Sequence, residues 1–353
     1  MDFTTDDSQD AVAEVVVSLL ERNSERDISL WPKLVDSGLP AVALPERYGG
    51  DEMGLPEISV LLTELATDAV ATPALSTFGF GVLPLLGNLP DDLADKIFPA
   101  VAGGAVLTAA LHEPGSPFAT SPATTATSRG GEMLISGHKV GVPYAEQAAW
   151  ILVPTDAGVA VVDAAAPGLD RRASPTSTGA AEYSLRLDEV AIPAGHLLSG
   201  TAPTDLHRCA LACLGSVADG LLTGALKLTT EHVRTRHQFG RPLAEFQAVA
   251  QEIGDIYVTS RTLHAAALAA NWALAELRRG DGDPDRVDDD LDVLAYCIAA
   301  ELPPAMQMCH HLHGGIGVDV THPLHRYYSQ AKDITRWLGG ESLRLDRLGA
   351  RCS

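Results

Sequence analysis

The sequence lacks an excess of basic charge, a secretion signal and a long apolar run. Its 353 residues carry a formal net charge of -21 at pH 7. This charge argues against non-specific nucleic-acid binding, which requires Lys and Arg to neutralise phosphates. The N-terminus is acidic and has no basic n-region of a signal peptide, and no apolar run approaches the roughly 20 residues that a membrane-spanning helix needs. We therefore expect neither nucleic acid nor membrane as a partner.

Cysteines are few and show no paired spacing. Cys209 and Cys213 lie one turn apart in a helical pattern, where small core residues are a simpler interpretation than metal ligands or a disulfide. The total of five cysteines is odd, and no signal peptide is recognisable. A reducing cytoplasm fits these features best, so we expect a cytoplasmic protein.

The residues that are present divide the chain into three regions. With 46% hydrophobic residues, a chain of 353 residues can bury sizeable cores in two or three domains. Residues 1–105 show helical spacing of apolar residues, whereas residues 106–203 contain short alternating runs punctuated by Gly and Pro, which are typical of an antiparallel β domain. Residues 204–353 predict a four-helix bundle, so the fold class is α+β. The four long helical patterns of this region cover about 204–236, 244–279, 290–312 and 324–349.

The stretch 236–247 separates the first two of these helical patterns. Gly240 and Pro242 interrupt the helix, and Arg236 and Gln238 lie at the break. An arginine fork and an amide beside an aromatic ring suit an anionic ligand with a planar ring. A loop whose arginines pair with local acids is the alternative that these residues leave open.

The same stretch, R-x-Q-F-G-x-P-x-x-x-F-Q, resembles the most recognisable segment of the acyl-CoA dehydrogenase family. Pro45–Gly50 is similar to that family's P-E-x-Y-G-G turn, and Leu187–Pro193 is similar to the strand that closes its β domain. The resemblance covers essentially the whole chain. It implies an N-terminal helical domain, a middle antiparallel β-barrel domain and a C-terminal four-helix bundle. It also implies that the loop reaches across a subunit interface to the adenosine pyrophosphate of an FAD held mainly by the neighbouring subunit. The implied contact residues are Arg236, Gln238, Phe239, Phe246 and Gln247.

A histidine-rich segment, His310–Arg326, lies near the end of the chain. The density of His suggests a metal site, but no Glu stands at the H-E-x-x-H spacing, and we expect no metal. His-Gly-Gly-Ile-Gly instead resembles the family's Gly-Gly-x-Gly turn, where glycines let backbone N–H groups approach the flavin pyrophosphate. The resemblance implies cofactor contacts from Gly314 and Gly315, and from His311, which stands where the family usually has Gln.

The catalytic base of the family is missing at its usual position. In the family, a Glu in an aromatic-Glu-Gly-Thr segment removes the α-proton of the acyl thioester. Here the segment reads Trp337–Gly340, with Leu338 at the Glu position, and a second family location aligns to about Ala210. Glu341 is a weak candidate substitute, because the helix dipole already explains an acid at a helix N-terminus. We therefore expect no catalytic residue in this chain.

Contacts to the flavin ring are also missing from the predicted β domain. The family strand K-x-W-I-T/S-x-G reads Lys139–Ala145 here, with Gly141 at the Trp position and Pro143 at the hydroxyl position. The family loop T-E-P-x-x-G-S-D reads Leu111–Phe118 and loses its G-S-D end. Features that hold a flavin within one subunit are degraded, whereas features that reach across an interface are present.

This division predicts an obligate heteromer with a paralogous acyl-CoA dehydrogenase subunit. The partner would supply the catalytic Glu and the flavin cradle, which gives one FAD per heterodimer and two in an α2β2 heterotetramer. His310–Tyr328 and Leu348–Ser353 most resemble the smaller subunit of an actinobacterial α2β2 enzyme of steroid degradation. That resemblance implies α,β-desaturation of an acyl-CoA, a steroid (cholesterol) side-chain CoA ester, with electrons passing to an electron-transfer flavoprotein. Two alternatives stay open: a self-sufficient homotetrameric acyl-CoA dehydrogenase, and a silent structural subunit that binds no flavin.

Overall fold

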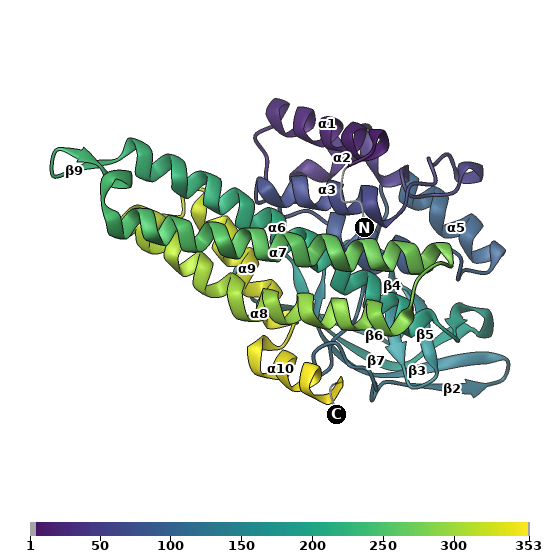
Figure 1. Ribbon diagram of the computed structural model, residues 1–353. Helices are drawn as coiled ribbons and strands as arrows, with labels where there is room; N and C mark the ends of the chain where they lie inside the picture. The colour runs from purple at the N-terminus through teal and green to yellow at the C-terminus, as the bar shows by residue number, and fades with distance from the viewer. Residues whose placement is uncertain (1–4, 352–353) are drawn as a thin grey trace. The chain divides into compact units, whose positions relative to one another are not determined.

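The computed structural model describes residues 5–351 (Figure 1). These residues form two compact units. Each unit combines segments that are far apart in the sequence. The bundle unit contains the chain up to Arg26, Ser59–Ala71 and the chain from Leu214 onward, and the sheet unit contains Asp27–Ile58 and Thr72–Cys213. The boundaries of the three domains given by the sequence patterns stay a prediction.

Long α-helices make up most of the bundle unit. The last of the four helical patterns folds as two helices, because Gly339 and Gly340 both adopt positive φ, of 82° and 80°, and interrupt it. Asp6 caps the first helix through a capping box with Gln9. The helices are α1 (Asp7–Arg22), the end of α3 (Leu55–Thr67), α6 (Ala202–Thr235) from Leu214 onward, α7 (Gln247–Arg279), α8 (Pro284–His313), α9 (Leu324–Trp337) and α10 (Gly340–Arg351).

Small residues on α6 let the helices of this unit approach closely, as the sequence predicts. A Cβ on Gly220 would lie 2.3 Å from the carbonyl oxygen of Thr63, and a Cβ on Gly224 would lie 2.1 Å from that of Thr67. The hydroxyl of Tyr327 on α9 donates a hydrogen bond of 2.8 Å to the same Thr67 oxygen. Glycine is therefore required where α6 crosses the backbone of α3.

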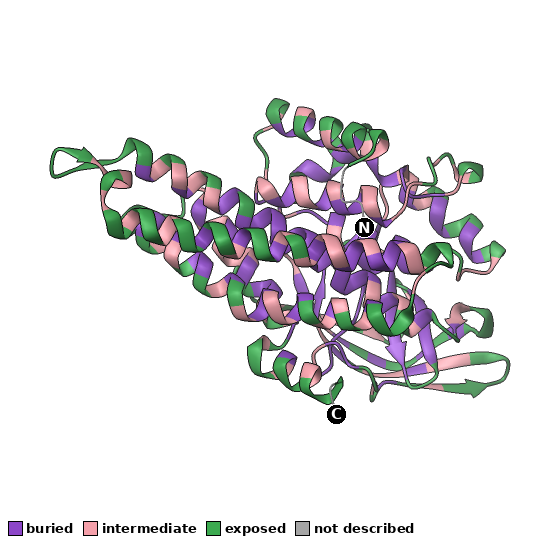
Figure 2. Ribbon diagram, in the orientation of Figure 1, coloured by how far each residue is buried: buried purple, intermediate pink, exposed green. Residues whose placement is uncertain are grey.

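Helix α6 corrects one expectation from the sequence. By length and composition it could cross a membrane, since an 18-residue window has a mean hydropathy of 1.6, whereas no run of this kind is expected from the sequence. In the folded chain 89% of that window is buried (Figure 2). The apolar character of α6 is therefore that of a core helix.

Two four-stranded sheets dominate the sheet unit, with strand orders β1-β4-β5-β8 and β2-β3-β7-β6. Strands β1 and β4 are parallel, and the other paired strands are antiparallel. The described strands thus form two separate sheets and not one closed barrel, within the acyl-CoA dehydrogenase-like arrangement that the sequence predicts. The strands are β1 (Val106–Ala109), β2 (Thr125–Arg129), β3 (Glu132–Pro143), β4 (Ala148–Thr155), β5 (Gly158–Asp163), β6 (Leu169–Ser174), β7 (Glu182–Pro193) and β8 (Leu197–Leu198).

Short helices complete the sheet unit and contribute to its core. Cys209 and Cys213 are buried there as small core residues, as predicted, and a Cβ on Gly79 would lie 2.7 Å from the Cβ of Cys213. These helices are η1 (Ile28–Leu30), α2 (Trp31–Asp36), η2 (Leu39–Ala41), η3 (Glu46–Tyr48), the π-helix η4 (Leu75–Val82), α4 (Leu83–Leu85), α5 (Asp91–Ala102) and η5 (Ala194–His196).

Candidate functional site

A β-hairpin joins α6 to α7 at the end of the bundle unit. Strands β9 (His237–Gln238) and β10 (Arg241–Pro242) pair in register, with Gln238 opposite Arg241. The two residues between them, Phe239 and Gly240, both have positive φ, of 52° and 81°, as a type I′ turn requires. The glycine that the sequence analysis read as a helix breaker is therefore the second residue of a hairpin turn.

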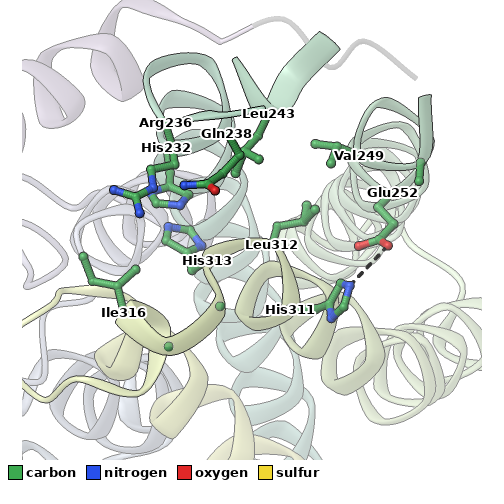
Figure 3. Close-up of a pocket in the computed structure, with 13 residues that line it drawn as sticks. His232, Arg236, Gln238, Leu243, Val249, Glu252, His311, Leu312, His313 and Ile316 are labelled. Atoms are coloured by element: carbon green, nitrogen blue, oxygen red, sulfur yellow. Dashed lines mark ion pairs between the residues drawn. The ribbon is translucent and has the colours of Figure 1, made fainter. Parts of the chain in front are cut away.

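The hairpin and the end of α8 line a half-open cavity of about 490 Å³ (Figure 3). Its wall combines α6, the hairpin, the short helix η6 (Leu243–Glu245), the first turns of α7, and η7 (Gly314–Val318). The lining residues are His232, Arg236, Gln238, Leu243, Ala248, Val249, Glu252, His311, Leu312, His313, Gly314, Gly315 and Ile316.

Five of the eight cofactor residues named from the sequence line this cavity. Two stretches that are separate in the sequence, 236–238 and 311–315, thus meet at one place. Phe239, Phe246 and Gln247 are not among the lining residues: Phe239 is 92% exposed at the tip of the hairpin, and its ring lies 6.2 Å from that of Phe246. The five lining residues are Arg236, Gln238, His311, Gly314 and Gly315.

Arg236 provides the positive charge of the cavity. Its backbone is fixed at the end of α6, because its N–H donates to the carbonyl of His232 and its carbonyl accepts from Leu243. Within residues 5–351 its guanidinium has no acidic partner. The alternative that the arginines of this loop pair with local acids therefore does not hold for Arg236. Arg241 lies instead 4.1 Å from the ring centroid of Phe246. A guanidinium that is not neutralised, next to the Gln238 amide, is suited to bind phosphate oxygens.

The glycine turn leaves room for a ligand to approach the backbone. Gly314 has φ 61° and ψ −142°, and its N–H ends α8 by donating to the carbonyls of His310 and His311. A Cβ added at Gly314 or Gly315 would meet no atom within 4 Å. Glycine is therefore required at 314 for conformation, and the open space at both positions suits close approach of a bulky anion.

Two stacked imidazoles lie beneath Arg236. The rings of His232 and His313 are 4.4 Å apart and nearly parallel, and Nδ1 of His313 is 2.8 Å from the carbonyl oxygen of Cys309. Burial and the nearby imidazoles lower the pKa of His313 to about 4. Burial also lowers the pKa of His232, with His322 and Arg236 adding to the effect. Both rings are therefore neutral at pH 7, which leaves Arg236 as the cation on this side of the cavity.

His311 and Glu252 form an ion pair across α8 and α7 when the imidazole is protonated. Nε2 of His311 lies 3.7 Å from Oε1 of Glu252. Glu252 was not identified from the sequence, although it lies four residues after Ala248 and thus on the same helical face as a lining residue. His232 was missed as well, and it lies one turn before Arg236. Helical spacing from the predicted residues is the signal that could have identified both.

The position of the family's catalytic Glu holds a buried side chain. Leu338 is 0% exposed, and its carbonyl oxygen accepts a 2.7 Å hydrogen bond from Nε of Arg344. Glu341 is exposed in the first turn of α10, as expected for an acid that is stabilised by the helix dipole. The segment therefore packs as part of the bundle core and presents no carboxylate at position 338.

The remnant of the T-E-P loop has a structural role in the sheet unit. The carboxylate of Glu113 lies 2.8 Å from Nζ of the fully buried Lys139, and it accepts hydrogen bonds from the hydroxyl of Thr124 and the N–H of Ala123. Burial opposes ionisation of Glu113, but Lys139, Thr124 and Ala123 outweigh it and lower the pKa to about 2. Glu113 is thus a permanently ionised partner of Lys139 and not a proton acceptor.

The positions that hold a flavin ring in the family are used for local packing. Gly141 adopts φ 66° and offers no ring, and the carbonyl of Pro143 accepts a 2.7 Å hydrogen bond from the hydroxyl of Thr108. Phe118, in place of the lost G-S-D end, is 1% exposed and lies edge-on to His112 at 5.1 Å. These residues do not fit a flavin ring, because neither the aromatic ring nor the hydroxyl is present.

Family models match the N-terminal and the C-terminal parts of the chain. Residues 4–105 match the family model described as acyl-CoA dehydrogenase, N-terminal domain, and residues 207–352 match the model described as acyl-CoA dehydrogenase, C-terminal domain. The chain is 49% identical over 353 residues to acyl-CoA dehydrogenase FadE28 of Mycobacterium tuberculosis (strain ATCC 25618 / H37Rv), covering 100% of this chain and 99% of that protein.

Solved structures with the same fold include a steroid ACAD variant and a complex. A variant of the Tcur3481-Tcur3483 steroid ACAD has a TM-score of 0.89 at 30% identity, covering 98% of this chain and 97% of that chain. The ChsE4-ChsE5 complex from Mycobacterium tuberculosis also has a TM-score of 0.89, at 29% identity, covering 100% of this chain and 99% of that chain.

Proposed function

The chain belongs to the acyl-CoA dehydrogenase family of FAD-dependent oxidoreductases, and we propose that it completes the flavin site of a paralogous partner subunit. In this proposal, the cavity of the bundle unit receives the adenosine pyrophosphate of an FAD whose ring is held by the partner. The partner also supplies the catalytic Glu. One FAD then serves each heterodimer of an α2β2 assembly.

One contrast carries the proposal. The cavity with Arg236, Gln238 and Gly315 has its donors and its open backbone in place, whereas a buried Leu338 occupies the position of the base. Gly141 and Pro143 cannot stack on or hydrogen-bond to a flavin ring. A chain that keeps only the features directed at a neighbouring subunit is best explained as one half of a shared site.

The residues of this chain bind and orient the cofactor. Arg236 forms charge-assisted hydrogen bonds to pyrophosphate oxygens, and the Gln238 amide adds a neutral donor. The open space at Gly314 and Gly315 lets the same oxygens approach the turn after α8. When bound, FAD supplies the acceptor for the β-hydride of an acyl-CoA. In this chain Leu338 offers no carboxylate and moves no proton.

The substrate class follows from the similar proteins. One of the two similar structures is described as a steroid ACAD, and the other is described as a ChsE4-ChsE5 complex. We therefore propose a steroid (cholesterol) side-chain CoA ester as the substrate of the assembled enzyme, with α,β-desaturation as the reaction and an electron-transfer flavoprotein as the electron acceptor. A cytoplasmic location is part of the proposal, in keeping with the buried free thiols of Cys209, Cys213 and Cys309.

Reconstitution of activity tests this proposal. This chain and a paralogous acyl-CoA dehydrogenase subunit are purified separately and then together, and bleaching of the flavin absorbance by a steroid side-chain acyl-CoA is followed. We expect bleaching from the combined subunits and none from this chain alone. Bleaching by this chain alone would favour the self-sufficient homotetramer. A complex that is active and retains its flavin when Arg236 is replaced would favour a silent structural subunit.

A further inference from the structure

The cavity of the bundle unit places a carboxylate opposite its cation. Glu252 of α7 lines the same cavity as Arg236 and Gln238. Figure 3 shows Glu252 and His311 on one side, and Arg236, Gln238 and His232 on the other. A site for a bare pyrophosphate would be weakened by such a carboxylate, because the two anions repel each other. The position of Glu252 therefore points to a second ligand group that donates hydrogen bonds.

The carboxylate of Glu252 keeps its capacity to accept hydrogen bonds. Its Oε1 lies 3.7 Å from Nε2 of His311, which is longer than an ordinary N–H···O hydrogen bond. Its Oε2 is buried and has no hydrogen-bond partner within residues 5–351. A buried carboxylate oxygen without a donor is unfavourable. Because Oε2 has almost no accessible surface, a ligand hydroxyl would reach it through a rotation of the Glu252 side chain, which would also relieve this unfavourable burial.

Apolar side chains separate the two polar sides of the cavity. Leu312 lies between them in Figure 3, and Leu243 and Val249 also line the wall. The cavity thus offers donors for phosphate, an apolar surface for a base, and an acceptor for hydroxyl groups. These three features match the phosphates, the base and the free ribose diol of a nucleoside diphosphate, since carboxylates are common acceptors for ribose hydroxyls.

We propose that Glu252 is a specificity-determining residue, which accepts a hydrogen bond from a ribose hydroxyl and excludes a nucleotide whose ribose carries an additional phosphate. This inference rests on the proposed function, in which the cavity receives the adenosine pyrophosphate of FAD. The acyl-CoA substrate contains the competing group, because coenzyme A is a 3′-phosphorylated adenosine diphosphate. Glu252 repels that extra phosphate and so reserves the cavity for the cofactor.

Binding of two small probes to the flavin-free, full-length chain tests the proposal. ADP and 3′-phospho-ADP are titrated by calorimetry into the wild-type chain and into Glu252→Gln, which keeps the shape of the side chain but removes its charge. Glu245→Gln serves as the matched control, because Glu245 is exposed on η6 and does not line the cavity. We expect the wild type and the control to prefer ADP by about ten- to a hundred-fold, as repulsion between close charges predicts, and Glu252→Gln to bring this ratio close to one.

The outcomes separate the inference from the function on which it rests. If ADP binding is weakened by Arg236→Ala but Glu252→Gln keeps the wild-type preference, the proposed site stands and the role of Glu252 is overturned. Equal binding of both probes to the wild type would overturn that role in the same way. If the wild-type chain binds neither probe at millimolar concentration, both the nucleotide site and the role of Glu252 are overturned.

Discussion

Arg236 is the single residue on which the proposed cofactor contact depends most. Its replacement by Ala removes charge-assisted hydrogen bonds worth roughly 1.5–3 kcal/mol. We therefore expect FAD to dissociate about ten- to a hundred-fold more readily from the assembled complex, as measured by the flavin absorbance that remains after gel filtration. Arg234→Ala is the control, since Arg234 is also exposed on α6 but lies outside the cavity lining. Equal flavin retention in the two variants would argue against the contact.

His313 makes the stability of the bundle end depend on pH. Burial lowers its pKa to about 4, whereas an unfolded His titrates near its ordinary value of about 6.5. Between these values the unfolded chain binds a proton that the folded chain does not bind, so stability decreases as pH falls from about 6.5 toward 4. The full loss amounts to about 3 kcal/mol. Thermal unfolding at several pH values should show a shallower acid slope for His313→Leu than for the wild type, and identical slopes would refute this assignment.

Only some of the side chains that line the cavity could be predicted from the sequence. Arg236, Gln238 and Gly315, which line the cavity, were predicted as cofactor residues because they belong to contiguous motifs. Glu252 belongs to no motif, and it reaches the cavity only because α7 and α8 pack side by side. Phe239 was assigned a cofactor contact, yet its ring lies outside the cavity in this chain and is available to a neighbouring subunit. Contacts made between subunits cannot be read from one chain.

At the scale of helices, glycine on α6 allows this helix to cross α3 at a short distance. Gly224→Ala places a Cβ 2.1 Å from the carbonyl oxygen of Thr67 and 2.5 Å from Cε1 of Tyr327. We expect this variant to lose about 1–3 kcal/mol of stability through overpacking, measured by denaturant unfolding. Gly254→Ala is the matched control, because Gly254 lies within α7 and its added Cβ meets nothing within 4 Å. Better helix propensity should make that variant more stable by about 0.5–1 kcal/mol. A Gly224→Ala variant as stable as the wild type would contradict the packing.

The helices and the hairpin were easier to predict than the sheets. Apolar spacing identified the long helices of the bundle unit, and Gly240 marked the turn between α6 and α7. The register of β3 against β7 shifts at two places, between Ile135 and Gly137 and between Lys139 and Val142. No local sequence pattern predicts such bulges. The separation of the strands into two sheets likewise depends on contacts between distant segments.

At the scale of the whole molecule, the two units differ in what they retain. The bundle unit has a cavity with donors for an anionic cofactor. In the sheet unit, the positions that hold the flavin ring in the family, such as Pro143 and Phe118, make local packing contacts instead. Family membership alone would assign a complete active site to the chain. The particular residues at 141, 143 and 338 argue instead that the site is completed by another subunit.

The flavin-to-protein ratio tests this central claim most directly. The chain is expressed alone and then together with a paralogous acyl-CoA dehydrogenase subunit, and FAD released by denaturation is compared with the amount of each polypeptide. The shared-site account predicts that the chain alone, which has only the weak nucleotide contacts of its cavity, retains little or no flavin through purification, and that the complex carries half a flavin per subunit. A full flavin per subunit on the lone chain would contradict it, and the flavin-ring contacts and catalytic base would then have to be sought within these 353 residues.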